Sequence, residues 1–190
     1  MITSKSGLMF FLLDTNRNNQ DLSDIDVPSY DELFCDAECV SWPYLLSNII
    51  CDKMVSRFHL MYNDEILSHS IYFESEFCIV LEHLMPLLNF LAYSSDGSYC
   101  FDFYEQGFIE DFFITHSVNT IHFQPSNKIR MNAEVRKLDF LNMLNLLYSN
   151  IVTIVDNHAP ELLRFNPYVE WKKEMKILLD RSIADSIPYA

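Results

Sequence analysis

The stretch that decides the fold runs from residue 96 to residue 108 and reads Asp-Gly-Ser-Tyr-Cys-Phe-Asp-Phe-Tyr-Glu-Gln-Gly-Phe. Aromatic and small or polar residues alternate from Tyr99 to Tyr104, which is the two-residue period of a β-strand. Asp96-Gly97 is typical of a hairpin turn, and Glu105-Gln106-Gly107 fits a three-residue hairpin loop in which Gly107 can take a positive φ. The stretch therefore predicts antiparallel β-structure.

The residues that follow predict a meander of further strands. Phe108 to Ile114 returns as a second strand, and a tight turn at His116-Ser117 leads into a third strand at 118–123. Pro125 ends that strand, and residues 128–132 add one more. The aromatic side chains of the first two strands are expected in the core, namely Phe101, Phe103, Phe112 and Phe113.

Shorter runs predict structure nearer the N-terminus. Residues 8–13 form a short apolar strand, and residues 44–50 and 54–62 are rich in β-branched and aromatic residues, so we expect two more strands there. Asn63-Asp64 marks the turn after them. A short helix is predicted at 30–34, with acidic residues in its first turn.

Three longer helices complete the predicted fold. Residues 76–92 have apolar residues at helical spacing, with Pro86 expected to kink or split the helix. The helix at 138–157 has apolar residues on and beside its main stripe, so it should be covered on more than one side. The last helix is amphipathic and is built on Trp171, Met175 and Leu178. The order of elements predicts a single α+β domain, an antiparallel sheet packed against helices.

The 190-residue chain is strongly acidic, and the acidity is uneven. It has 27 Asp and Glu against 13 Lys and Arg, a net charge of -14. The acidic N-terminal segment 1–40 carries -6, the sheet region 41–133 carries -7, and the helical region 134–190 carries only -1. Such a chain repels nucleic acid and anionic lipid, so we expect neither as a direct ligand. A basic protein partner is the electrostatically favoured one.

The cysteines and the apolar segments indicate a cytoplasmic protein. The five Cys residues are odd in number and mostly lie far apart, which is unlike a secreted disulfide framework and favours reduced thiols. Asp14 stops the N-terminal apolar run too early for a signal peptide. The two most apolar stretches, 77–93 and 140–155, are interrupted by polar residues, so we expect buried helices and no membrane span.

The sequence lacks the common signatures of catalysis. With glycine only at positions 7, 97 and 107, neither a phosphate-binding loop nor a dinucleotide-binding loop can be written. Cys35 and Cys39 have no second ligand pair at zinc-finger distance. His116 and His122 straddle a hairpin and could come near Cys100, but ordinary turn and strand positions explain them better. We therefore expect no enzymatic activity, no metal and no cofactor.

Two groups of acidic residues are the candidate binding sites. Their simplest interpretation is a solvated, solubilising surface. Among functional uses, docking a basic surface is favoured over catalysis, because few basic neighbours are present to tune a carboxyl pKa. Interleaved aromatic residues at 30, 34 and 42 favour an interface for the second group. The candidate partner-binding residues are Asp96, Asp102, Glu105, Glu110 and Asp111 in the meander, and Asp31, Glu32 and Asp36 in the N-terminal segment.

The run from Asp96 to Phe108 resembles the central hairpin of small bacterial immunity proteins, which neutralise the toxin domains of polymorphic and contact-dependent inhibition systems. The helix before it and the long helix after it are similar to the same plan, so the likeness covers about residues 44–158. The resemblance implies an acidic, cytoplasmic, non-enzymatic protein that binds a cognate toxin, often a basic nuclease. The acidic first 40 residues have no counterpart in that plan.

Two other functions are compatible with the same residues. The chain could be an acidic adaptor or assembly subunit with a non-toxic partner. It could also be a metal-assisted hydrolase that uses the carboxylates of the meander.

Overall fold

The computed structural model describes residues 9–14, 43, 57–62, 65–66, 71–72, 77–94, 97–103, 110–124, 133–158 and 160–187. Within these ranges the chain forms two antiparallel sheets and three long helices, two of which fill the C-terminal part. The α+β class predicted from the sequence is thereby confirmed.

The larger antiparallel sheet, called sheet B here, is the predicted meander. Its strands are β5 (Tyr99–Phe103), β6 (Glu110–His116), β7 (Thr120–Gln124) and β8 (Ala133–Arg136), and they follow one another in the order β5-β6-β7-β8. β7 begins later than predicted, because the turn spans residues 117–120 and the Ser117 amide donates to the Thr120 carbonyl at 2.9 Å. The fourth strand lies just after the predicted 128–132, which is outside the described residues.

The prediction for Asp96-Gly97 is wrong. Gly97 has a φ of +110°, as expected of a turn glycine, but helix α3 (Phe77–Tyr93) precedes it and β5 follows. It therefore belongs to a helix-to-strand connection and not to a β-hairpin. An Asp-Gly pair predicts a turn, but it does not predict whether a strand or a helix precedes that turn. The apolar spacing of residues 77–93 is what makes the preceding element a helix. The predicted loop at 105–107 lies outside the described residues.

The smaller antiparallel sheet, sheet A, is built around its second strand. β1 (Met9–Asp14) pairs with β2 (Arg57–Tyr62) over its whole length, from Met9 opposite Tyr62 to Asp14 opposite Arg57. β3 (Glu65–Ile66) and β4 (Ile71–Tyr72) both pair with β2 as well. The strands predicted at 8–13 and 54–62 are thus present. The predicted strand at 44–50 and the short helix at 30–34 lie outside the described residues.

The helices follow the predicted pattern closely. α3 continues through Pro86, whose ring is exposed, so the proline does not split the helix. α4 (Lys137–His158) is followed by the 3-10 turn η1 (Pro160–Arg164) and by α5 (Asn166–Asp185), which has Pro167 in its first turn. Proline is well tolerated there because the amides of the first turn have no partner within the helix.

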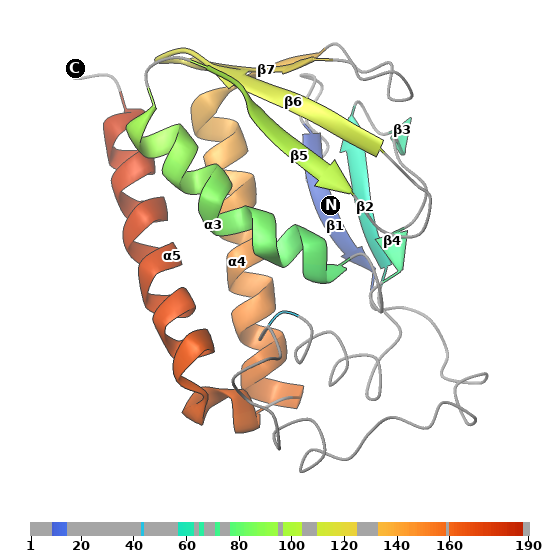
Figure 1. Ribbon diagram of the computed structural model, residues 1–190, viewed down its shortest axis with the longest axis vertical. Coiled ribbons are helices and arrows are strands. Elements are labelled where there is room, and N and C mark those ends of the chain that lie inside the picture. Colours follow the sequence, from blue (N-terminus) through green and yellow to red (C-terminus); the bar gives the residue numbers. More distant parts are fainter. Residues whose placement is uncertain are drawn as a thin grey trace.

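The helices lie on one side of sheet B (Figure 1). α4 and α5 run antiparallel beside each other, and α3 crosses them beneath β5 and β6. α4 contacts α5 and η1, the strands β7 and β8 of sheet B, and β1 of sheet A. It therefore lies between both sheets and the other helices.

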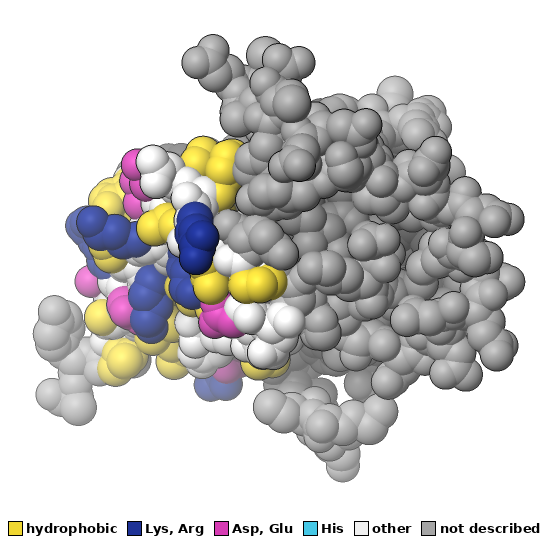
Figure 2. Space-filling view, turned by 90° about the horizontal axis from the view of Figure 1, so that it is seen from below, with side chains coloured by type: hydrophobic (Ala, Val, Ile, Leu, Met, Phe, Trp, Pro, Cys, Tyr) yellow, Lys and Arg dark blue, Asp and Glu magenta, His cyan; other side chains and the backbone are white. Residues whose placement is uncertain are grey.

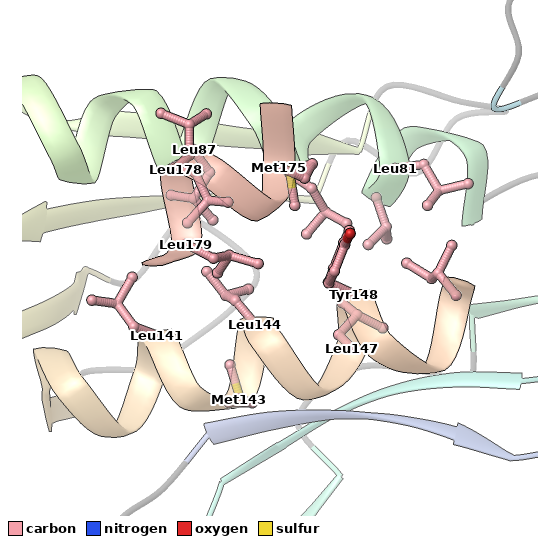
Figure 3. Packing of buried hydrophobic residues seen from close by; sticks show 14 of the residues in the cluster. Leu81, Leu87, Leu141, Met143, Leu144, Leu147, Tyr148, Met175, Leu178 and Leu179 are labelled. Carbon is pink, nitrogen blue, oxygen red and sulfur yellow. The ribbon is translucent and has the colours of Figure 1, made fainter. Parts of the chain in front are cut away.

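The apolar residues of α4 explain this central position (Figure 3). Leu141, Leu144 and Tyr148 point towards α3 and α5, while Met143 lies on the side that faces β1. The prediction that this helix is covered on more than one side is confirmed. The apolar positions predicted for α3 are also all buried, namely Val80, Leu84, Leu87, Leu88 and Leu91.

α4 is long and apolar enough to cross a membrane by length and composition alone. Half of that stretch is buried inside the protein, against the neighbouring elements just described. Core helices of soluble proteins meet the same criterion, so one such helix is weak evidence for a span. Its burial fits the predicted core helix of a soluble protein.

Two leucines on α4 provide a matched test of this packing. Leu144 is 0% exposed and Leu146 is 57% exposed. We expect Leu144→Ala to lower the free energy of unfolding by about 2–5 kcal/mol through lost burial and the resulting cavity. Leu146→Ala should change it by no more than about 0.5 kcal/mol. Urea denaturation of both variants measures the difference, and equal losses would contradict the assigned orientation of α4.

Tyr168 on α5 should make stability sensitive to alkaline pH. It is fully buried, and burial, with smaller contributions from Asp156 and Tyr148, raises its pKa above the ordinary value of 10.0. Above about pH 10 the unfolded chain releases this proton while the folded chain keeps it, so stability falls as pH rises. Tyr168→Phe should reduce that loss by about 1.4 kcal/mol per pH unit. Urea unfolding at several pH values between about 9 and 11.5 tests this, and an unchanged slope would contradict it.

Candidate functional site

The register of sheet B separates its residues into two faces. Phe101, Ile114, Ile121, Phe123 and Val135 occupy one face and are buried against the helices. The alternate positions form the other face, which we call the open face because its described side chains are half-buried or exposed. By register, the open face comprises Cys100 and Asp102 on β5, Asp111, Phe113 and Thr115 on β6, Thr120, His122 and Gln124 on β7, and Glu134 and Arg136 on β8.

This register brings two predicted binding residues together and separates a third. Asp102 lies directly opposite Asp111, and opposite residues of an antiparallel pair belong to the same face. Glu110 lies opposite Phe103, at a position of the inner face, so the meander acids do not form one cluster. The remaining predicted residues lie outside the described residues, namely Asp96, Glu105, Asp31, Glu32 and Asp36.

The register also corrects one expectation about the core. Phe101 is fully buried, as predicted, but Phe113 is only half-buried. Phe113 pairs with Cys100 and Gln124, two exposed residues, and so belongs to the open face. Two consecutive aromatic residues in a strand must point to opposite faces, which is why Phe112 and Phe113 could not both face the core.

A chain of polar contacts crosses the β7–β8 half of the open face. The Nδ1 atom of His122 is 3.5 Å from a carboxylate oxygen of Glu134, on the neighbouring strand. The Nε2 atom of the same ring is 3.2 Å from the Thr120 hydroxyl, which is 2.7 Å from the Ser117 hydroxyl. The Thr120 amide also donates to the Ser117 hydroxyl at 3.2 Å. The four residues therefore form one polar network, in which His122 is the residue that contacts strand β8.

The basic residue of the open face is already paired. Arg136 donates from Nε and Nη2 to the two carboxylate oxygens of Asp139, at 2.6 and 2.8 Å. Asp139 lies in the first turn of α4, so this fork joins the sheet edge to the helix. The acids Asp102, Asp111 and Glu134 thus face no uncompensated Lys or Arg among the positions of the open face.

The two histidines of the β6–β7 hairpin lie on opposite faces. His122 pairs with Thr115 on the open face, whereas His116 pairs with Ile121 on the inner face and meets the ring of Phe90 edge-on at 5.0 Å. They cannot converge on one metal ion with Cys100. In the part of the chain that the structure describes, no group of three or more His, Cys, Asp or Glu could hold a metal.

Lys137 joins α3, β6 and α4 below the inner face. Its ammonium donates to the carbonyl of Leu91, near the C-terminal end of α3, at 2.8 Å, and lies 3.5 Å from Nδ1 of His116. A cation is favourable there because the last carbonyls of a helix carry partial negative charge. Burial lowers the pKa of Lys137 below 10.5, an effect that Asp185 opposes. This contact is structural, since it satisfies a helix end.

A second polar contact fixes α3 to β5. The Tyr99 hydroxyl and Nδ1 of His83 are 2.5 Å apart, and the His83 ring stacks on Phe101 with centroids 4.4 Å apart. Burial, with a smaller contribution from Cys100, raises the pKa of Tyr99 above its ordinary value. The phenol is therefore held neutral between helix and sheet, as a structural group requires.

The helical end of the molecule does not carry the acidic excess. Seen from below, Lys and Arg side chains lie among Asp, Glu and hydrophobic ones (Figure 2). The helical region 134–190 holds eight acids and seven bases, a net charge of -1. Since the whole chain carries -14, the other -13 belongs to residues 1–133, which include Asp102 and Asp111.

Sequence reasoning missed the His122 network. Thr120 and His122 alternate within the predicted strand at 118–123, which is a signal that they share a face, but Glu134 follows the predicted strand at 128–132. Only the pairing of β7 with β8 brings Glu134 opposite His122. No protein-family model, no curated protein and no solved structure matches the chain.

Removing the Lys137 ammonium should loosen the junction of α3 and α4. In Lys137→Met the Leu91 carbonyl loses its charged donor, and we expect the free energy of unfolding to fall by about 1–3 kcal/mol. Lys173→Met, at an exposed position of α5, is the matched control and should change it by no more than about 0.5 kcal/mol. Urea denaturation compares the two, and equal stability would refute the role given to Lys137.

Proposed function

We propose that this protein is a cytoplasmic immunity protein, which binds a basic bacterial toxin domain and neutralises it without catalysing a reaction. The observation that carries the proposal is the register of β5 and β6, which places Asp102 opposite Asp111 on the open face of sheet B. An antiparallel sheet with helices on one side offers its other face to solvent or to a partner. Here that face has acids and no unpaired Lys or Arg among its positions.

The overall charge supports a cationic partner. An excess of negative charge raises the encounter rate with a basic protein and disfavours acidic competitors. Directly opposed like charges weaken a strand pair. An acidic pair at 102 and 111 is therefore better explained by a partner's positive charge than by the stability of the hairpin.

Phe113 supports an interface on the same face. It is half-buried, and it belongs to the Cys100–Phe113 pair, which is the next pair on the same face after Asp102–Asp111. Protein interfaces favour aromatic anchors surrounded by polar and charged residues. In the proposed mechanism the carboxylates steer the toxin, the aromatic ring slows its dissociation, and the bound protein keeps the toxin inactive.

Charge reversal on the open face tests this function. The binding partner for the test is any toxin domain that the neighbouring genes encode, purified as an inactive variant. We expect Asp102→Lys with Asp111→Lys to slow association about tenfold or more at low salt, because both attraction and steering are lost. The difference should shrink at high salt, where exposed charges are screened. Surface plasmon resonance at two ionic strengths measures both effects.

Glu170→Lys with Glu174→Lys is the matched control, because it changes the net charge equally on the exposed side of α5. It should slow association much less than the change on the sheet. An equal effect of both double variants would show that only total charge matters. Absence of any complex with the wild-type protein would refute the immunity function for that toxin.

A further inference from the structure

We infer that His122 makes the open face proton-responsive, so that its affinity for a cationic partner falls as the pH drops from about 7.5 to about 5.5. This inference rests on the proposed function and adds a regulation to the same surface. Histidine is the side chain whose charge ordinarily changes in this pH interval. The position of His122 on the open face and the polar contacts of its ring support this response.

His122 is in the middle of the β6–β7–β8 row of the open face. It is flanked by Thr115 on β6 and Glu134 on β8. Its side chain is 43% exposed and that of Glu134 is 60% exposed. Protons can therefore reach the imidazole without any opening of the fold.

The network satisfies the neutral ring. With the proton on Nδ1, that N–H group lies 3.5 Å from the Glu134 carboxylate, and Nε2 accepts from the Thr120 hydroxyl. The Thr120 oxygen then accepts from the Ser117 hydroxyl, whose own oxygen accepts the Thr120 amide. The hydroxyl groups of Thr120 and Ser117 can therefore each donate one hydrogen bond that fits the neutral ring.

The same network satisfies the charged ring. When Nε2 also carries a proton, it donates to the Thr120 oxygen, and the Thr120 hydroxyl turns to donate to the Ser117 oxygen. Ser117 is exposed, so its hydroxyl proton turns to water. Two hydroxyl rotations therefore accommodate the added proton, and no hydrogen bond among these groups is lost. A pair of interconvertible states of this kind is what a reversible switch needs.

Protonation changes the charge that a partner meets. The charged groups near His122 on this face are Glu134 beside it and Arg136, which Asp139 already neutralises. Asp102 and Asp111 lie on the other half of the face. One added positive charge, placed against Glu134, therefore removes about a third of the negative charge offered by these three acids.

A short cationic peptide tests the inference with the full-length protein. The probe is dodeca-lysine, which keeps its charge over the whole pH range. Its dissociation constant is measured at low ionic strength from the amide shifts of open-face residues in two-dimensional NMR, at about pH 7.5 and about pH 5.5. Between about pH 7.5 and about pH 5.5, the dissociation constant of the wild type should rise by a factor roughly two- to fivefold larger than that of His122→Gln. A factor of this size corresponds to the free energy of one interaction between exposed charges.

His116→Gln is the control, since it removes the imidazole of the same hairpin that lies on the inner face. It should retain the wild-type pH dependence, and the spectra report whether each variant is folded. Equal pH dependence in the wild type and in His122→Gln overturns the inference and leaves the proposed docking face intact. If dodeca-lysine shifts no open-face amide at about pH 7.5, the docking face itself is wrong and the inference falls with it.

Discussion

The structure depends on burying α4 from more than one side. Its residues Leu141, Leu144 and Tyr148 require cover from the other helices, while Met143 requires cover on the opposite side, where β1 packs. A helix that is apolar on two sides is stable in water only between layers. The positions of α3, α5 and both sheets follow from this requirement. Sheet B consequently has its helices on one face, and among the described elements no helix covers the other face.

The open face gains its chemical character from strand register. Because side chains alternate along a strand, a single pairing decides which acids share a face. The pairing of Asp102 with Asp111 leaves Glu110 on the inner-face register, and the pairing of β7 with β8 brings Glu134 to His122. Five of the predicted binding residues lie outside the described part of the chain, so the structure bears on the sheet alone. The proposed interface is therefore a property of strand pairing more than of local composition.

Polar groups on the two faces of sheet B have different tasks. Below the sheet, Lys137 and Tyr99 satisfy a helix end and a histidine in partly buried surroundings, where an unmet hydrogen bond is expensive. On the open face, the Glu134–His122–Thr120 chain is in contact with water, so its contribution to stability is small. Its arrangement is better explained by the charged and polar groups that it presents outward.

Periodicity in the sequence determined the α+β class, the meander and the apolar stripes of the helices, because spacing alone places a residue on a helix face or a strand face. It could not determine strand partners, such as the pairing of β2 with β1, which lies far away in the sequence. It also could not show that Asp96-Gly97 follows a helix, or that Phe113 faces outward. Those features depend on contacts between residues far apart in the chain, whose free energies become favourable only when the whole domain packs. Tertiary structure alone decided which acidic residues share a face of sheet B, because that depends on strand pairing, and therefore where we propose that a partner docks.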